Sequence, residues 1–214
     1  MNSEIKLLAG VLAGTIVLIV GGAFLMGGQG SVDSGAIVAD GERLARSDDP
    51  ALGPEDARVT VTEFSDFYCP SCKAVAVVLK QVVDEYEGKS VKFVFRNFPL
   101  TQSLSDEKAL PAHAALAAQR QGKFWEYHYT LFENQPNLSR DNLLKFAEEL
   151  GMDRVAFEEA MDSSEVKDAV RQDKSDATSL GLQGTPTFFI NGIEYTGERS
   201  VEGFSEAINQ ALEG

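Results

Sequence analysis

Cysteine is scarce in this chain of 214 residues, which contains only Cys69 and Cys72. Two cysteines cannot cross-link a small disulfide-rich scaffold, and they cannot supply the four thiolates of an all-cysteine zinc site. Basic residues are also few, because 19 lysines and arginines stand against 33 acidic residues, giving a net charge of -14. This balance argues against nucleic acid and anionic lipid headgroups as partners, since both are bound by cationic surfaces.

Apolar residues, by contrast, make up 43% of the chain, which excludes a disordered acidic tail. Residues 7–26 contain no charged side chain, and a helix of this length spans the hydrocarbon core of about 30 Å. The apolar regions of signal peptides are shorter, about 7–15 residues. The sequence therefore predicts one transmembrane helix, an uncleaved signal anchor at residues 1–28, with a cleaved signal peptide as the alternative.

The orientation of this anchor follows from the charges around it. Lys6 precedes the apolar run, and the positive-inside rule then leaves the rest of the chain on the extracytoplasmic (periplasmic or outer) face. Residues 29–54 are rich in Gly, Ser, Asp and Ala and contain Pro50 and Pro54, so we expect a flexible tether there. A short helix within 36–46 is the one element this segment could hold.

The remaining residues, 55–214, predict one α/β domain with a mixed sheet. A β-branched, alternating strand at 58–64 is followed by a helix from Pro70 to about 87 and a second strand at 91–95. A helical insertion occupies about 104–181. A short strand at 187–190 then leads through Asn191-Gly192, a strong hairpin signal, into a strand at 193–195 and a closing helix at 201–212.

The chemistry of the chain is concentrated in Cys69-Pro70-Ser71-Cys72, at the predicted start of a helix. The free N–H groups and the dipole of the first turn stabilise a thiolate, so the pKa of Cys69 should fall below its ordinary value of about 8.5. Pro70 suits the first turn because that position needs no donor. Cys72 lies one turn further in and is more shielded, which makes Cys69 the attacking thiol and Cys72 the resolving one.

Two other interpretations of the cysteine pair stay open. The pair could be half of a zinc site, although only His113 and His128 remain as ligands and their spacing is unusual. It could also be a structural disulfide, although so small a ring removes little entropy from the unfolded chain. Thiol–disulfide exchange is the interpretation that we carry forward, with no metal site expected.

Three motifs make the chain resemble the DsbA-like thiol–disulfide oxidoreductases, which are thioredoxin-fold proteins with a helical insertion. They are EFSDFYCPSC at 63–72, KFWEYH at 123–128 and GTPTFFING at 184–192, within a match over 59–212. The membrane-anchored disulfide-formation proteins of Gram-positive-type bacteria look most similar. The resemblance implies a thioredoxin-like mixed sheet with an inserted helical subdomain.

The resemblance also implies roles for several residues. Pro186 falls on the family's cis-proline, which packs against the active-site cysteines, and it supports the site together with Pro70 and Ser71. Thr185 falls on the residue whose backbone pairs with a substrate chain. Glu63 falls on the family's acidic residue beneath the cysteines, where a buried carboxyl could exchange a proton with Cys72; an ordinary solvent-facing glutamate is the alternative.

One departure from the family concerns the residue before the second cysteine. Strongly oxidising members carry histidine where this chain has Ser71, and a protonated imidazole would help to hold the thiolate. We therefore expect a less oxidising disulfide than in those members.

Aromatic residues are candidates for an apolar surface that contacts unfolded substrates. Phe67 and Tyr68 are the main candidates, and the two histidines are expected to be structural. Further candidates are Phe98, Trp125 and Tyr127.

The predicted function is extracytoplasmic donation of the Cys69–Cys72 disulfide to reduced, exported proteins. The chain carries no flavin- or quinone-binding signature, so no cofactor is expected, and the resemblance implies a separate quinone-linked membrane protein for reoxidation. We expect a monomer, since no dimerisation domain is evident. The alternatives are a reductase or isomerase of the same fold, and a chaperone or binding module with a structural disulfide.

Overall fold

The computed structural model describes residue 39 and residues 41–214. The predicted signal anchor at 1–28 and the first part of the predicted tether lie outside these residues. Within the described part, no helix is both long and apolar enough to cross a membrane.

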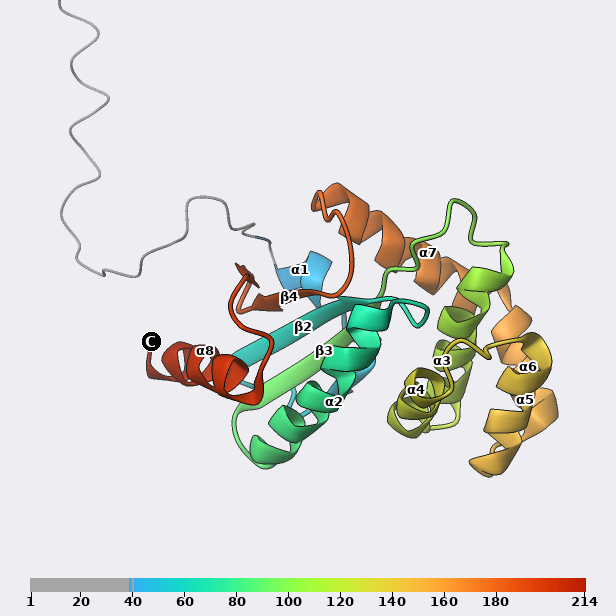
Figure 1. Ribbon diagram of the computed structural model, residues 1–214, viewed down its shortest axis with the longest axis horizontal. Coiled ribbons are helices and arrows are strands. Elements are labelled where there is room, and N and C mark those ends of the chain that lie inside the picture. The colour runs from blue at the N-terminus through green and yellow to red at the C-terminus, as the bar shows by residue number, and fades with distance from the viewer. Residues whose placement is uncertain (1–38, 40) are drawn as a thin grey trace, which may run out of the picture. The chain divides into compact units, whose positions relative to one another are not determined.

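The core of the described chain is a five-stranded mixed sheet in the order β1-β3-β2-β4-β5 (Figure 1). The first crossover makes β2 and β3 parallel, and all other neighbours are antiparallel. This is the predicted mixed sheet, with a βαβ unit followed by a hairpin. The strands are β1 (Ala51–Leu52), β2 (Val59–Ser65), β3 (Val91–Asn97), β4 (Thr187–Ile190) and β5 (Ile193–Tyr195).

Helices cover both faces of this sheet. Helix α2 (Pro70–Glu85) and helix α8 (Val201–Glu213) pack together over one face. Helix α7 (Ser164–Ser179) packs on β3 from the other face, where the short α1 (Gly41–Leu44) adds Leu44 to the same apolar cluster. Because both faces are covered, β2 and β3 are buried almost along their whole length.

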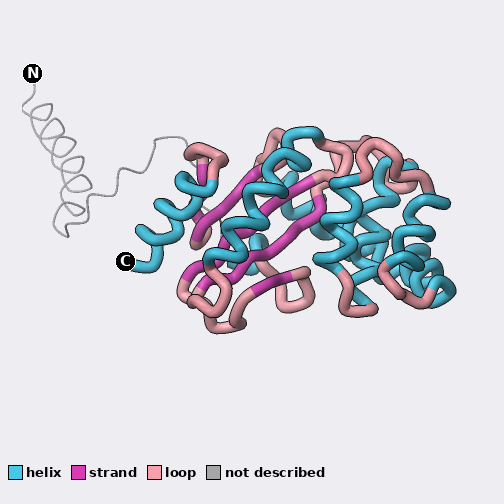
Figure 2. Tube along the Cα trace, turned by 60° about the horizontal axis from the view of Figure 1, so that its bottom comes forward, coloured by secondary structure: helices cyan, strands magenta, loops and turns pink. Residues whose placement is uncertain are grey.

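The helical insertion lies beyond one end of the sheet (Figure 2). Its core is built on α3, whose eight residues from Pro111 to Ala118 are all buried. Ser139 caps α5 (Arg140–Glu149) by accepting a hydrogen bond from the Asn142 N–H. The elements are η1 (Glu107–Ala109), α3 (Leu110–Arg120), α4 (Phe124–Glu133), α5 (Arg140–Glu149), α6 (Arg154–Asp162) and α7.

The predicted hairpin is present. Asn191 and Gly192 both have positive φ, 47° and 85°, which matches the twist of the flanking strands. A side chain at Gly192 would also meet the carbonyl oxygen of Ala39 at 2.7 Å. Glycine is therefore required there for two reasons.

The predicted tether at 29–54 is wrong for its C-terminal part, because residues 41–54 belong to the fold. Leu44 is 3% exposed, and Ala51 and Leu52 pair with β3 as an edge strand. Asp49 is also buried, beside two arginines. These contacts are made with distant segments, so the local composition of Gly, Ser and Pro gave no sign of them.

Candidate active site

Cys69 lies at the point where α2 begins. It is the N-cap residue, with φ -78° and ψ 120°, and Pro70 is the first helical residue. The N–H of Lys73 donates to the Cys69 carbonyl at 3.1 Å and closes the first turn. The Cys69 side chain is partly exposed, beside the N–H groups that a helix start leaves without helical partners.

The pKa of Cys69 is lower than that of an ordinary thiol, although burial alone would raise it. Hydrogen bonding from Thr185 and from the backbone N–H groups of Cys72 and Ser71 outweighs the burial. These donors hold the thiolate form, as the helix dipole also does. Ser71 is exposed and serves the site through its backbone.

Cys72 has the opposite character. It is 0% exposed, one turn into α2, and burial raises its pKa far above the ordinary value. The nearby charge of Glu63 raises the pKa further. Both cysteines are free thiols in this structure. The site therefore pairs an accessible thiol that ionises readily with a shielded thiol that keeps its proton.

Glu63 lies on β2 beneath the cysteines, opposite Phe95 on β3 and Phe188 on β4. Its side chain is buried, so the alternative of a solvent-facing glutamate is excluded. Burial raises its pKa to about 7, while the hydroxyl of Ser65 and the charge of Arg199 act in the other direction. The Oε1 atom of Glu63 has no hydrogen-bond partner among the described residues.

The loop before β4 completes the site. The Thr185–Pro186 peptide bond is cis. In the thiol form, Cys69 donates to the carbonyl oxygen of Thr185 at 3.3 Å, and the buried Thr185 hydroxyl has no partner among the described residues. This hydroxyl is the side-chain donor that is available to the Cys69 thiolate. Arg199 donates to the Pro186 carbonyl at 3.0 Å. The fold thus places Thr185 and Pro186 beside a cysteine 116 residues earlier in the chain.

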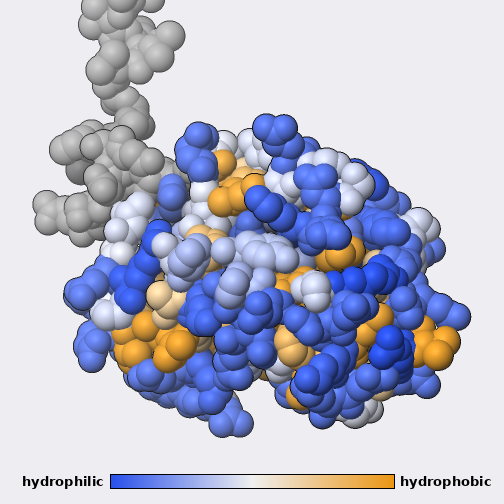
Figure 3. Space-filling model, turned by 45° about the vertical axis from the view of Figure 1, so that its right-hand side comes forward, coloured by the Kyte–Doolittle hydropathy of each residue, from blue (hydrophilic) through white to orange (hydrophobic). Residues whose placement is uncertain are grey.

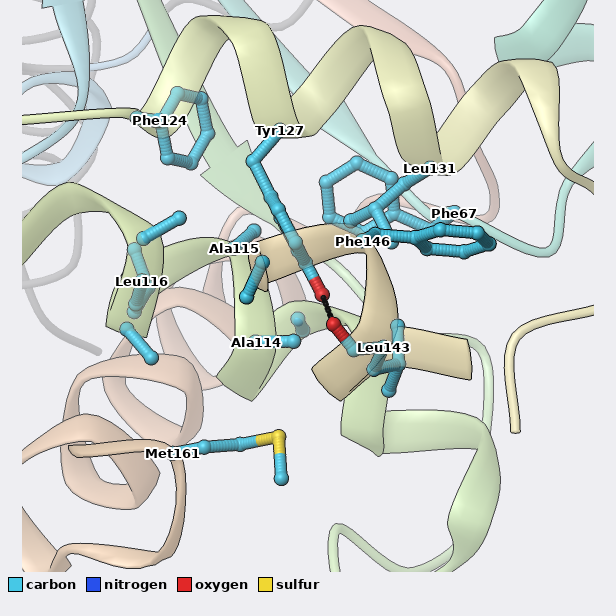
Figure 4. Packing of buried hydrophobic residues seen from close by; sticks show 14 of the residues in the cluster. Phe67, Ala114, Ala115, Leu116, Phe124, Tyr127, Leu131, Leu143, Phe146 and Met161 are labelled. Carbon is cyan, nitrogen blue, oxygen red and sulfur yellow. Dashed lines mark hydrogen bonds between the residues drawn. The ribbon is translucent and has the colours of Figure 1, made fainter. Parts of the chain in front are cut away.

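The expectation of a substrate-contacting Phe67 is wrong. This ring is 2% exposed, and it stacks on Phe95 with 5.4 Å between the ring centroids. Phe98 and Tyr127 are buried as well, and the Tyr127 hydroxyl donates to the Leu143 carbonyl at 2.8 Å inside the insertion core (Figure 4). Phe67 packs into the core of the insertion, to which Tyr127 itself belongs, while Phe98 packs with Phe64 and Phe189 on the other face of the sheet.

Tyr68 and Trp125 are the two candidates that stay partly exposed. The hydroxyl of Tyr68 donates to the Leu138 carbonyl at 3.4 Å, so its ring lies where the insertion meets the loop before α2. A substrate contact for Tyr68 remains a prediction. The face drawn in Figure 3 is mainly hydrophilic, with apolar patches between the polar side chains.

Gln135 is a site residue that the sequence did not reveal. Its side-chain amide donates to the carbonyl oxygens of Phe67 and, at 3.3 Å, of Cys69. Asp66 supports the same loop by accepting from the N–H groups of Tyr68 and Leu100, each at 2.8 Å. Gln135 comes from the loop after α4, 66 residues from Cys69, so no local pattern could have indicated it.

The two histidines are buried, at 2% and 3% exposure for His113 and His128. Across the described part of the chain, no three His, Cys, Asp or Glu side chains gather closely enough to hold a metal ion.

This arrangement suits disulfide exchange, in which one thiol ionises and stays accessible while its partner is shielded. Comparison with known proteins agrees. The model of the thioredoxin family matches residues 46–210, so the chain belongs to that family. Its similarity to a disulfide bond formation protein over nearly its whole length places it among the DsbA-like proteins of that family.

Three relatives illustrate this class. The "Probable disulfide bond formation protein D" of Bacillus anthracis is 33% identical over 202 residues, which are 90% of this chain and 91% of the relative. The oxidised crystal structure of BdbD from Bacillus subtilis has a TM-score of 0.71 at 25% identity, covering 84% of this chain and 99% of BdbD. A thioredoxin-like oxidoreductase from Silicibacter pomeroyi has a TM-score of 0.72 at 29% identity, covering 82% of this chain and 99% of the other.

A different kind of relative shares only this domain. The "Na(+)/H(+) antiporter NhaA 3" of Salinispora tropica is 36% identical over 164 residues, which are 77% of this chain and 25% of the antiporter. The chain therefore spans about a quarter of the length of such relatives.

Proposed function

We propose that the chain is a disulfide oxidase, which donates the Cys69–Cys72 disulfide to reduced polypeptides outside the cytoplasm. The observation that supports this most is the lowered pKa of Cys69. A stabilised thiolate favours the reduced enzyme, so the corresponding disulfide is more strongly oxidising.

The reaction starts from the disulfide form. A substrate thiolate attacks the sulfur of Cys69, the Cys69–Cys72 bond breaks, and Cys72 leaves as a thiolate. A second substrate thiolate then attacks the substrate sulfur of this mixed disulfide and releases Cys69, also as a thiolate. The substrate loses two electrons and gains a disulfide, and the enzyme becomes a dithiol.

Glu63 has the properties of the proton donor for the departing Cys72. Its pKa of about 7 keeps a fraction of the carboxyl protonated near neutral pH, and the pKa of Cys72 lies far higher. A proton therefore moves downhill from the carboxyl to the Cys72 thiolate. The product is a neutral buried thiol above an ionised carboxylate.

Substrate binding falls to the loop with the cis peptide bond. Thr185 lies against Cys69, and β4 starts two residues later. A substrate chain that pairs with the backbone of Thr185 would bring its own sulfur to Cys69. Main-chain pairing does not read side chains, which suits an enzyme with many substrates.

Reoxidation requires an electron acceptor. We assign this role to a separate quinone-linked thiol oxidase in the membrane. The N-terminal anchor would tether the domain to the same membrane. Tethering raises the effective concentration of the two partners. We expect the domain to act as a monomer.

The decisive measurement is the equilibrium reduction potential of the full chain in glutathione buffers, with the thiol state of the cysteines in the cell. We expect a potential between about -270 mV, the value of thioredoxin, and about -120 mV, that of DsbA. The cellular protein should be mainly oxidised. A potential at or below that of thioredoxin, with a mainly reduced protein, would identify a reductase instead. A chaperone would keep its activity when both cysteines are replaced by alanine.

A further inference from the structure

A small cavity lies next to Glu63, between the sheet, α2 and α4. Its volume is about 20 Å³, and Glu63, Ala76, His128 and Tyr129 are among the residues that line it. A single water molecule needs about 10–15 Å³, so the cavity has room for one. It needs polar partners as well, and Glu63 and His128 are polar side chains among the lining residues.

His128 is one of these partners and has no assigned task in the proposed reaction. It is 3% exposed, and neither of its ring nitrogens has a hydrogen-bond partner among the described residues. Six aromatic rings surround it, with centroids 4.9–5.9 Å from its own. Burial lowers its pKa to about 3, so the ring is neutral and offers one donor and one acceptor.

Glu63 is the second polar side chain at this cavity with an atom that lacks a hydrogen-bond partner in the described part of the chain. Its Oε1 atom is buried without a partner among the described residues, and Glu63 lines the same cavity as His128. Buried polar atoms without hydrogen bonds are rare in folded proteins. Two of them around one water-sized cavity point to a bridging water as the shared partner.

We propose that His128 is a positioning residue, which holds the carboxyl of Glu63 through a water molecule in this cavity and thereby sets its proton exchange with Cys72. This inference rests on the proposed role of Glu63 as proton donor. His128 keeps its own proton throughout. Only the proton of the Glu63 carboxyl moves, to the thiolate of Cys72, and it is replaced from solvent.

The protonation of Glu63 also depends on the groups that face it from other elements. Cys72 approaches from α2 and Ser65 from β2 itself, while Arg199 acts from the loop before α8. Tyr129 of α4 lines the cavity and senses the charge of Glu63. None of these is altered in the variants below.

The test is a pH titration of the protonated Glu63 carboxyl by infrared difference spectroscopy in the reduced full-length protein. Glu63→Gln identifies the band. We expect His128→Phe to move the midpoint to higher pH by about one unit, because the carboxylate loses a hydrogen-bonded partner. His128→Gln keeps a donor and an acceptor and should bring the midpoint back toward that of the parent.

His113 supplies the matched control. It is 2% exposed, and neither of its ring nitrogens has a partner in the described part of the chain. The charges that act on it are those of Lys167, Asp162 and Arg171, and it does not line the cavity beside Glu63. His113→Phe should leave the midpoint of Glu63 where it is.

A second measurement covers the case in which His128→Phe does not fold. The ring-nitrogen NMR shifts of His128 in the parent protein should change as Glu63 titrates, and this change should be lost in Glu63→Gln. Shifts that ignore Glu63, or a midpoint unmoved in a folded His128→Phe, would overturn the proposal. These readouts do not involve the reduction potential, so a reductase-like potential would refute the oxidase while leaving the role of His128 standing.

Discussion

Each face of the central sheet buries a charged side chain, but only one of the two side chains forms ion pairs within the described part of the chain. Glu63 lies opposite Phe95 in the pairing of β2 with β3, and the next pair is Phe64 with Arg96. Consecutive residues of a strand point to opposite faces, so Glu63 and Arg96 lie on different sides of the same sheet. One face carries the active site, and the other carries a cluster of ion pairs.

The Arg96 face has partners for its charges. Arg96 is 0% exposed and donates to Asp173 at 2.8 Å, to Asp176 at 2.6 Å and to the Arg43 carbonyl at 2.7 Å. Asp173 also accepts from the backbone N–H of Asn97 at 2.9 Å. These bonds join β3 to α7 and to the segment around α1.

The Glu63 face lacks such partners. One oxygen of the carboxyl is unpartnered among the described residues, and burial holds its pKa at about 7. The contrast teaches that burial alone does not decide what a charged residue does. Where partners saturate the charge it stabilises the fold, and where they do not, the group is poised to exchange a proton.

Removing Arg96 should have the largest effect on stability. Arg96→Met leaves buried aspartates short of a partner, and we expect a loss of about 3–5 kcal/mol in the free energy of unfolding. Urea denaturation followed by circular dichroism measures it. The rate of disulfide exchange in the fraction that remains folded should change little, because Arg96 faces away from the cysteines.

Arg140→Met is the control for this experiment. Arg140 pairs with Glu158 and Asp162 on a partly exposed surface, so its loss should cost no more than about 1 kcal/mol. Equal losses for the two variants would contradict the view that the buried cluster is the stabilising one.

Replacing Glu63 should increase the free energy of unfolding, whereas replacing Arg96 should decrease it. The pKa of Glu63 rises from 4.5 to about 7 on folding, so the folded chain binds more protons than the unfolded chain between these values. The destabilisation caused by the ionised Glu63 carboxylate is absent below pH 4.5 and reaches its full size above pH 7. Glu63→Gln should therefore stabilise the reduced protein at pH 8 by up to about 3 kcal/mol, and by little at pH 4.

The same variant should slow disulfide transfer to a reduced substrate, because the amide that replaces the carboxyl cannot give up a proton to Cys72. Stability is measured by urea denaturation at each pH, and transfer by stopped-flow fluorescence. Glu87→Gln, on the exposed end of the loop after α2, serves as the control. A Glu63→Gln protein that is less stable at pH 8 than its parent would contradict the account of this face.

Much of the fold could be predicted because local signals mark its elements. The Ser139 cap, Pro70 at the start of α2 and the Asn191-Gly192 turn each fix an element boundary by a hydrogen bond or a backbone angle. The CxxC motif likewise indicates its own chemistry, since a helix start lowers the pKa of the first thiol wherever it occurs.

The residues that sequence reasoning missed depend on long-range packing. Gln135 reaches the cysteine loop from the insertion, and Arg96 finds Asp173 and Asp176 on a helix about 80 residues away. Phe67 looks like a surface ring until the insertion covers it. Motif and periodicity describe a segment by itself, and these contacts arise only when segments meet.

The smallest effect should come from removing the Thr185 hydroxyl. This change separates the side-chain contribution to the pKa of Cys69 from the backbone contribution. The Thr185 hydroxyl is buried without a hydrogen-bond partner among the described residues while Cys69 is a thiol, and its hydrogen bond to the thiolate lowers the pKa of Cys69. Thr185→Val keeps the shape and the carbonyl, so we expect the pKa of Cys69 to rise by at most about one unit. Thiolate absorbance in the ultraviolet, followed against pH, measures the pKa of Cys69.

Thr187→Val is the control, because the Thr187 hydroxyl donates to the Gly184 carbonyl at 2.8 Å instead. An unchanged pKa in Thr185→Val would assign the stabilised thiolate to the helix start alone.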